Sequence, residues 1–218
     1  MPEFIRIPKD IGRGLRSTSG ELIKGEKIET GHEGEKQFVD ATVVRNEKER
    51  YAGSYVKKKY GNYMEAVQDA KKIEELKSAG VPTPDVVRYF EEDDNAYLLI
   101  TDLSKKGENY VWSMGDSDES FRNLRLNDDD YREIQQQLEE ISMKASDLNF
   151  TVASDAFFLV KPKKEGTPTR VFVGDIGMNV KKMNKADPMH EKFNNQQAAR
   201  FLETVVPEEK LEAVPDLA

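Results

Sequence analysis

In the first half of the chain, apolar and polar residues alternate over short runs, which is the pattern of half-buried β-strands. Three such runs cover residues 22–28, 37–45 and 51–60. Between Tyr63 and Ser78 the apolar residues recur three positions apart, which predicts an amphipathic helix. Gly80 ends this helix, and two nearby prolines prevent its continuation. Two more strands are expected after it, at residues 86–90 and 96–101.

The second half of the chain contains longer helical patterns. An acidic first turn followed by apolar residues at helical spacing predicts a helix over residues 128–146. Residues 156–160 and 171–174 have the pattern of two strands joined by a polar turn, and residues 194–204 that of a final helix. The polar segment 104–127 is expected to hold a connector and a short helix. The pattern as a whole predicts an α+β protein.

Composition limits the kind of protein this can be. At 218 residues the chain forms one large domain or two small lobes with a hydrophobic core. The formal net charge of −8 argues against general binding to nucleic acids or anionic membranes. No apolar run approaches the roughly 18–20 residues that span a membrane, and the amino terminus lacks the apolar core of a signal peptide. We therefore expect a soluble, cytoplasmic protein.

Two residue types that often carry chemistry are scarce. The chain has no cysteine, which excludes disulfides, thiolate metal sites and cysteine nucleophiles. Its two histidines, His32 and His190, are too few for a metal centre built from several histidines. A histidine base is not expected either. A candidate site must therefore be sought among other side chains.

One short motif stands out as a candidate metal ligand. The apolar strand 171–174 leads directly into the turn Asp175-Ile176-Gly177. A carboxylate at a strand end supplies the hard oxygen ligands that Mg²⁺ prefers, and Gly177 allows the backbone to turn sharply. The same tripeptide is also common in ordinary turns, so its meaning depends on the rest of the chain.

The order of the expected elements resembles the protein kinase fold. Five strands with a helix after the third are followed by a connector, a long helix and a hairpin that ends in Asp-x-Gly. The chain is most similar to compact variants such as RIO-type and aminoglycoside-phosphotransferase-like kinases, over about residues 25–180. The resemblance implies a bilobal fold with an N-terminal arm (1–24), an N-lobe with a five-stranded antiparallel sheet and one helix (25–103), and a truncated, mainly helical C-lobe (104–218).

The resemblance implies ATP as a cofactor and assigns several N-lobe residues to it. Gly31 and Gly34 lie where kinases have their glycine-rich loop, although the full pattern is absent and a plain turn is the alternative. Strand alternation places Lys58 on the face of Val56, so Lys58 is the first choice for the phosphate-binding lysine and Lys57 the second.

Further N-lobe positions follow from the same resemblance. The helix carboxylate that would orient the lysine falls on Asp69, with Glu65 and Glu74 as alternatives. At the end of the fifth strand, Thr101 and Leu103 would present backbone groups to adenine. An ordinary buried strand has the same pattern.

The C-lobe positions concern metal binding and proton transfer. The resemblance assigns Asp155 and Asp175 to Mg²⁺. Phe150 occupies the position of the family's catalytic base and cannot accept a proton. Asp147 is the nearest alternative base, and Asp155 is a further one. The segment after Asp175 also lacks the Ala-Pro-Glu motif and is short for a lobe that grips a protein substrate.

Two functions fit this pattern. The first is a small nucleotide-binding protein that acts as a degenerate or atypical phosphotransferase with ATP and Mg²⁺. The second is a catalytically inactive, pseudokinase-type module that binds a protein partner. An unrelated α+β domain that shares the element order by chance is the remaining alternative, and it would bind no nucleotide.

Overall fold

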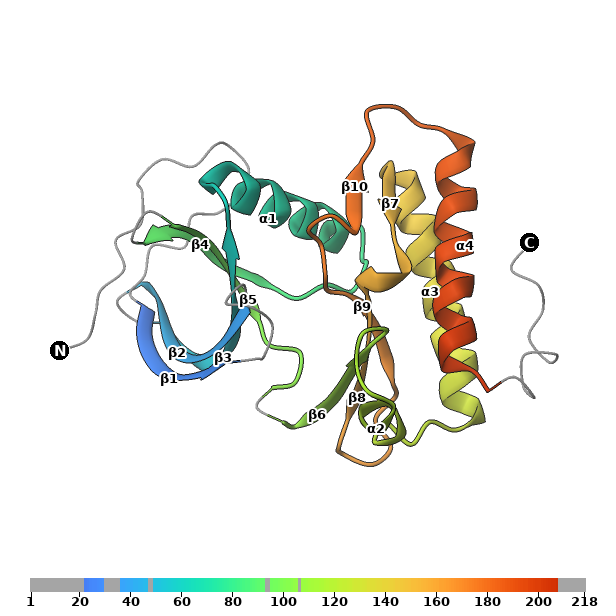
Figure 1. Ribbon diagram of the computed structural model, residues 1–218, viewed down its shortest axis with the longest axis horizontal. Coiled ribbons are helices and arrows are strands. Elements are labelled where there is room, and N and C mark those ends of the chain that lie inside the picture. Colours follow the sequence, from blue (N-terminus) through green and yellow to red (C-terminus); the bar gives the residue numbers. More distant parts are fainter. Residues whose placement is uncertain (1–21, 30–35, 47–48, 93–94, 106, 208–218) are drawn as a thin grey trace. The chain divides into compact units, whose positions relative to one another are not determined.

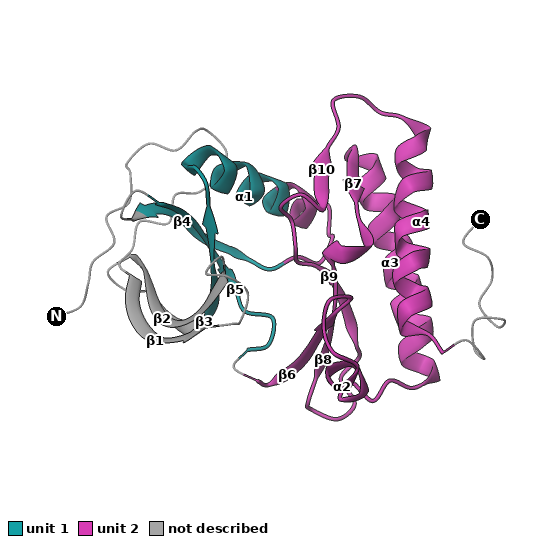
Figure 2. Ribbon diagram, in the orientation of Figure 1, with its two compact units in different colours: residues 1–74, 84–106 teal, residues 75–83, 107–218 magenta. Residues whose placement is uncertain are grey.

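A computed structural model of the chain describes residues 22–29, 36–46, 49–92, 95–105 and 107–207 (Figure 1). For the first two strands and the start of the third it describes the backbone alone. The chain divides into two compact units (Figure 2), unit 1 with residues 1–74 and 84–106 and unit 2 with residues 75–83 and 107–218. Each unit is described below by itself.

Unit 1 contains a five-stranded antiparallel sheet in the order β1-β2-β3-β5-β4. The strands are β1 (Leu22–Glu29), β2 (Lys36–Asn46), β3 (Glu49–Tyr60), β4 (Val86–Glu92) and β5 (Asn95–Thr101). The helix α1 (Tyr63–Ser78) follows β3, and the side-chain oxygen of Asn62 accepts a hydrogen bond from the amide of Glu65 at its start. These positions confirm the strands and the helix expected in this half.

The register of the sheet separates two faces of β3. Lys58 of β3 pairs with Leu98 of β5, and Leu98 pairs in turn with Tyr89 of β4. Directly paired residues point to the same face of a sheet, so these three residues share one face. The ring of Tyr89 contacts Tyr63 of α1, with centroids 5.9 Å apart. This face is therefore the one beside α1. Lys57, opposite Leu99, lies on the other face, as strand alternation predicted.

Unit 2 combines two small sheets with helices. Strands β6 (Asn109–Ser113), β8 (Phe157–Pro162) and β9 (Arg170–Val173) form one sheet, and β7 (Phe150–Val152) pairs with β10 (Val180–Lys182). The helices are α2 (Asp118–Arg122), α3 (Asp128–Asp147) and α4 (Pro188–Val205), with a short 3-10 turn, η1 (Ser154–Ala156). Helices α3 and α4 pack side by side, and α4 also contacts β7 and η1 (Figure 1).

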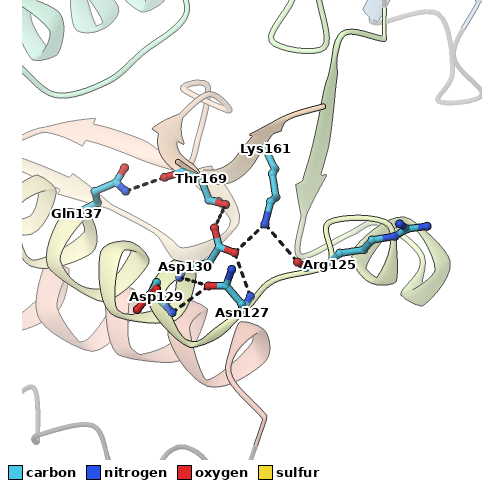
Figure 3. Close-up of polar contacts among 7 residues, drawn as sticks. All are labelled: Arg125, Asn127, Asp129, Asp130, Gln137, Lys161 and Thr169. Atoms are coloured by element: carbon cyan, nitrogen blue, oxygen red, sulfur yellow. Dashed lines mark hydrogen bonds and ion pairs between the residues drawn. The ribbon is translucent and has the colours of Figure 1, made fainter. Parts of the chain in front are cut away.

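A polar contact fixes β9 on α3. The side-chain amide of Gln137 donates to the carbonyl oxygen of Thr169 at 3.0 Å (Figure 3) and accepts from the amide of Val171 at 2.9 Å. One side chain of α3 thus satisfies two backbone groups at the start of the strand that leads to Asp175. This contact sets the position of β9 relative to the long helix.

The α+β class expected from the sequence is confirmed, but three short strands were not predicted. Strands β6, β7 and β10 have 5, 3 and 3 residues, too few to show an alternating pattern. Helix α4 begins at Pro188 rather than at Asn194, because Asp187 caps its first turn through the amide of Met189. In the described part of the chain, no helix is both long enough and apolar enough to cross a membrane.

Candidate functional site

The Asp175 turn of unit 2 is held against the segment that carries Asp155. The amides of Gly174 and Asp175 both point to the carbonyl oxygen of Ala156, at 2.9 and 3.5 Å. Ala156 directly follows Asp155, so one carbonyl group links the two carboxylate-bearing segments. The structure thus brings the backbones of the two predicted metal ligands together.

Close packing around Gly174 leaves no room for a side chain at this position. A Cβ atom there would lie 2.8 Å from Cδ2 and 3.0 Å from Cε2 of the Phe158 ring. Phe158 belongs to β8, which pairs with β9. The glycine before Asp175 therefore allows the turn to approach the aromatic ring of the neighbouring strand.

The loop around Asp155 is fixed by backbone contacts on both sides. The amide of Ala153 donates to the carbonyl oxygen of Asn179 at 2.8 Å. The amide of Ser154 donates to the side chain of Gln197 on α4 at 3.0 Å. Asp155 itself is exposed. Its backbone is thus anchored while its carboxylate reaches solvent.

Asn179 is a site residue that the sequence reasoning did not identify. Its side-chain nitrogen Nδ2 donates a hydrogen bond of 3.1 Å to Oδ2 of Asp175. Its carbonyl oxygen accepts from Ala153, as described above, so Asn179 contacts both carboxylate-bearing segments. The only signal in the sequence is a polar residue four positions after Asp175, and that signal is too common to be decisive.

A buried asparagine on α4 supports the strand that precedes this loop. Asn194 is 1% exposed, and its side-chain oxygen accepts from the amide of Val152 at 2.8 Å. Its side-chain nitrogen donates to the carbonyl oxygen of Phe150 at 2.8 Å and to Ser146 at 2.9 Å. The side chain therefore satisfies one edge of β7 in the way a neighbouring strand would, while β10 pairs with β7 through the register Val180–Val152.

In unit 1 the two candidate lysines have different surroundings. Lys57 is 6% exposed, and its Nζ lies 3.9 Å from the centre of the Tyr97 ring and 5.4 Å from that of Phe90. This contact fits a structural cation–π interaction. Lys58 is half-buried on the face beside α1. The two lysines thus lie on different faces of β3, and Lys58 stays the first choice for the phosphate-binding lysine.

Two of the three candidate carboxylates of α1, Asp69 and Glu65, have partners within unit 1, and the third, Glu74, is half-buried. Asp69 is buried and accepts from the Tyr60 hydroxyl at 2.9 Å and from Lys72 at 2.9 Å. Glu65 is exposed, and its carboxylate accepts from the side chain of Asn62 at 2.7 Å, at the start of the helix. Tyr60 lies two positions after Lys58 on β3, so both side chains are on the same face of the sheet. The hydrogen bond from Tyr60 therefore places Asp69 of α1 on that side.

The end of β5 is held by its own hydrogen bonds. The amide of Thr101 donates to the carbonyl oxygen of Asp85 at 3.0 Å, so this amide is not available to adenine. The amide of Asp102 donates to the carbonyl oxygen of Ser54 at 3.1 Å, and the buried Asp102 carboxylate accepts from the Ser54 hydroxyl at 2.8 Å. Leu103, the other predicted contact, is half-buried. Gly31 and Gly34 lie outside the described residues.

The position that the resemblance assigns to the base is buried, whereas the alternative bases Asp147 and Asp155 are exposed. Phe150 is 0% exposed and lies under Nζ of Lys182, 4.4 Å from its ring centre. Asp147 is the last residue of α3 and is exposed. Asn149 then turns the chain into β7 with a φ of 59°. The position of the family's base is therefore part of the hydrophobic core of unit 2.

The donor set of unit 2 fits a magnesium ion only with help from a substrate. Within the described residues there is no group of three or more histidine or acidic side chains that could hold a metal. The carboxylates of Asp155 and Asp175 are hard oxygen donors suited to Mg²⁺. Mg²⁺ commonly binds through one or two carboxylates, with phosphate oxygens and water completing its octahedral shell. The residues present match that mode rather than a closed metal cage.

A second carboxylate network in unit 2 is structural. Oδ2 of Asp130, a residue 6% exposed, accepts from Nζ of Lys161 at 2.7 Å and from the amide of Asn127 at 3.0 Å, and Oδ1 accepts from the Thr169 hydroxyl (Figure 3). Burial raises the pKa of Asp130, but the three hydrogen bonds and the charge of Lys161 outweigh it and lower the pKa below its usual value. Asp130 thus joins the start of α3 to the β8–β9 hairpin.

Compared with protein-family models and with curated protein sequences, the chain gives no match.

Proposed function

We propose that this protein is a small kinase-like protein that binds ATP together with Mg²⁺ and acts as a degenerate or atypical phosphotransferase. The observation that carries the proposal is the contact between the two aspartate segments of unit 2. The carbonyl oxygen of Ala156 receives the amides of Gly174 and Asp175, which keeps the backbones of Asp155 and Asp175 close.

Contacts in unit 1 give separate support. The resemblance to kinases implies a five-stranded antiparallel sheet with one helix after the third strand, and unit 1 has such a sheet with α1 after β3. Lys58 lies on the sheet face beside α1, and the buried Asp69 lies on that side of the sheet. A lysine in this setting binds phosphate oxygens through charge-assisted hydrogen bonds.

The proposal gives each group a chemical task. Mg²⁺, when bound, neutralises negative charge on the phosphates. Asp155 and Asp175 would hold it, and Lys58 would bind phosphate oxygens. No residue takes the place of the buried Phe150 as a base, so proton removal from an acceptor would fall to Asp147 or Asp155. We therefore expect phosphate transfer to be slow compared with a typical kinase.

The experiment that tests the proposal is a thermal-shift measurement of the full chain with ATP, with and without Mg²⁺. The proposal predicts that ATP raises the melting temperature more when Mg²⁺ is present, and that Asp175→Asn removes the metal-dependent part. Asp118→Asn, at an exposed aspartate of the same unit with no role in the proposed site, is the matched control and should keep it. Absence of any nucleotide-dependent shift in the wild-type protein would overturn the proposal.

A second function is favoured by one specific observation. The family's base position is filled by Phe150, which is fully buried in the core of unit 2. This favours an inactive, pseudokinase-type module that binds a protein partner. The two functions are separated by incubating the protein with radiolabelled ATP and Mg²⁺. Label transferred to the chain or to a generic acceptor supports the phosphotransferase, whereas binding without transfer supports the inactive module.

A further inference from the structure

Asn179 has two separate contacts, one through its side chain and one through its backbone. The side-chain nitrogen donates to Oδ2 of Asp175 at 3.1 Å. The backbone carbonyl oxygen accepts from the amide of Ala153 at 2.8 Å, two residues before Asp155. The same residue thus fixes the Asp175 carboxylate and the loop that carries Asp155.

The backbone of Asn179 is itself well anchored. The next residue, Val180, donates its amide to the carbonyl oxygen of Ile176 at 2.8 Å, which closes the turn after Asp175. Val180 also pairs with Val152 as the first residue of β10, and it is buried. The Asn179 side chain is therefore presented from a rigid position rather than from a free loop.

We propose that Asn179 is a positioning residue for the cation: it holds the Asp175 carboxylate in the orientation that binds Mg²⁺. The inference rests on the proposed function, because it assumes that Asp175 is a ligand. The amide nitrogen of Asn179 carries hydrogen atoms and no available lone pair, so through this contact it acts on the metal by way of Asp175.

The physical reason for such a role is orientation. A carboxylate with a donor fixed on one oxygen loses less rotational freedom when a cation binds, so more of the binding energy appears as affinity. Groups that hydrogen-bond to metal ligands commonly change metal affinity by about 10–100-fold when they are removed. Asn179 is the residue that gives Asp175 such a contact from the turn that follows it.

The design of the variants separates orientation from stability. Asn179→Leu has a similar size and keeps the backbone contacts, but it removes the side-chain donor. Asn179→Asp has the same shape and replaces the donor with a second carboxylate, which repels Asp175 until a cation binds between them. Asn184→Leu, in the exposed segment between β10 and α4, is a control for the leucine substitution.

The test is binding of Mn²⁺ to the full chain, measured from the loss of the electron paramagnetic resonance signal of free Mn²⁺, because Mn²⁺ accepts the same oxygen ligands as Mg²⁺. Melting temperatures in chelator serve as the second readout. We expect Asn179→Leu to weaken Mn²⁺ binding about 10–100-fold with a melting temperature near that of Asn184→Leu. Asn179→Asp should melt lower in chelator, yet gain more stability from Mn²⁺ than the wild type.

The outcomes separate the role of Asn179 from the existence of the metal site. If wild-type Mn²⁺ binding is lost in Asp175→Asn but unchanged in Asn179→Leu, the site stands and the role of Asn179 is wrong. If Asn179→Leu lowers the melting temperature in chelator and leaves Mn²⁺ affinity unchanged, the residue is structural only, and the inference is overturned. If the wild-type chain binds no Mn²⁺, both the inference and the proposed metal site fall.

Discussion

The side-chain nitrogen of Asn179 lies 3.1 Å from Oδ2 of Asp175 and donates a hydrogen bond to it. This contact joins the turn after β9 to the residue just before β10. A neutral donor of this kind orients a carboxylate without cancelling its charge.

Gly174 is expected to be intolerant of even the smallest side chain. In Gly174→Ala the new methyl group would lie 2.8 Å from the Phe158 ring, so the ring or the turn must move. We predict a loss of roughly 1–3 kcal/mol in the free energy of unfolding, measured by urea denaturation. The same substitution in a Phe158→Ala background should cost clearly less. Equal costs in both backgrounds would show that the ring contact is not the cause.

Asn194 is expected to be one of the more sensitive polar positions in unit 2. Asn194→Leu leaves the amide of Val152 and the carbonyl group of Phe150 buried without their side-chain partner. Each such group costs about 1–3 kcal/mol, so a loss of roughly 2–6 kcal/mol is expected in chemical denaturation. Gln196→Leu, at an exposed position of the same helix, should change stability little. Similar losses in the two variants would contradict the role assigned to Asn194.

Asp130 makes a pH-dependent contribution to stability. Its folded-state pKa is lower than the usual value of 3.8, so the ionised form stabilises the fold fully above about pH 4. This contribution disappears as the pH falls through the lowered pKa. Asp130→Asn should cost roughly 3 kcal/mol at pH 7 because it leaves Lys161 without its counter-charge.

The pH dependence of Asp130 is measured as the difference in unfolding free energy between the wild type and Asp130→Asn. The difference should be constant from pH 7 to about pH 5 and should shrink below about pH 4. The control is Asp129→Asn, whose carboxylate is 81% exposed and paired with the exposed Arg132. That variant should differ little from the wild type at any pH. A difference for Asp130→Asn that grows in acid would contradict the assigned contacts.

The two neighbouring lysines of β3 are expected to respond in opposite ways. Lys57→Met keeps an apolar stem but loses the contact with the Tyr97 ring, which should lower stability by roughly 0.5–2 kcal/mol and leave ATP binding unchanged. Lys58→Met should weaken ATP binding about tenfold or more, as expected for loss of a charged hydrogen bond. Denaturation and ATP titration of both variants check this. The reverse assignment would make Lys57 the ligand-binding residue.

Elements with a strong period were predictable from the sequence. Helices α1 and α3 were expected at residues 63–78 and 128–146, and the structure has them at Tyr63–Ser78 and Asp128–Asp147. The five strands of unit 1 and the pair that carries the Asp175 turn were expected as well. The faces of β3 followed from alternation alone.

Contacts between distant residues were not predictable. Asn194 binds Val152 and Phe150, which lie 42 and 44 positions earlier, and one asparagine in a helix does not indicate such partners. Asn179 is four positions from Asp175, and their contact lies in an irregular turn that shows no periodic pattern in the sequence. Which face of β3 lies beside α1 is shown by the contact of Tyr63 with Tyr89, and strand alternation alone does not indicate it.

The most direct test of the central claim is a calorimetric titration of the full chain with ATP in Mg²⁺ and in chelator, repeated for Asp175→Asn. That substitution keeps the shape of the side chain and an oxygen that can accept from Asn179. We predict that the wild type binds ATP more tightly in Mg²⁺ than in chelator, and that this difference vanishes in Asp175→Asn. ATP binding that is equal in both conditions, or a Mg²⁺ effect that persists in Asp175→Asn, would contradict the account.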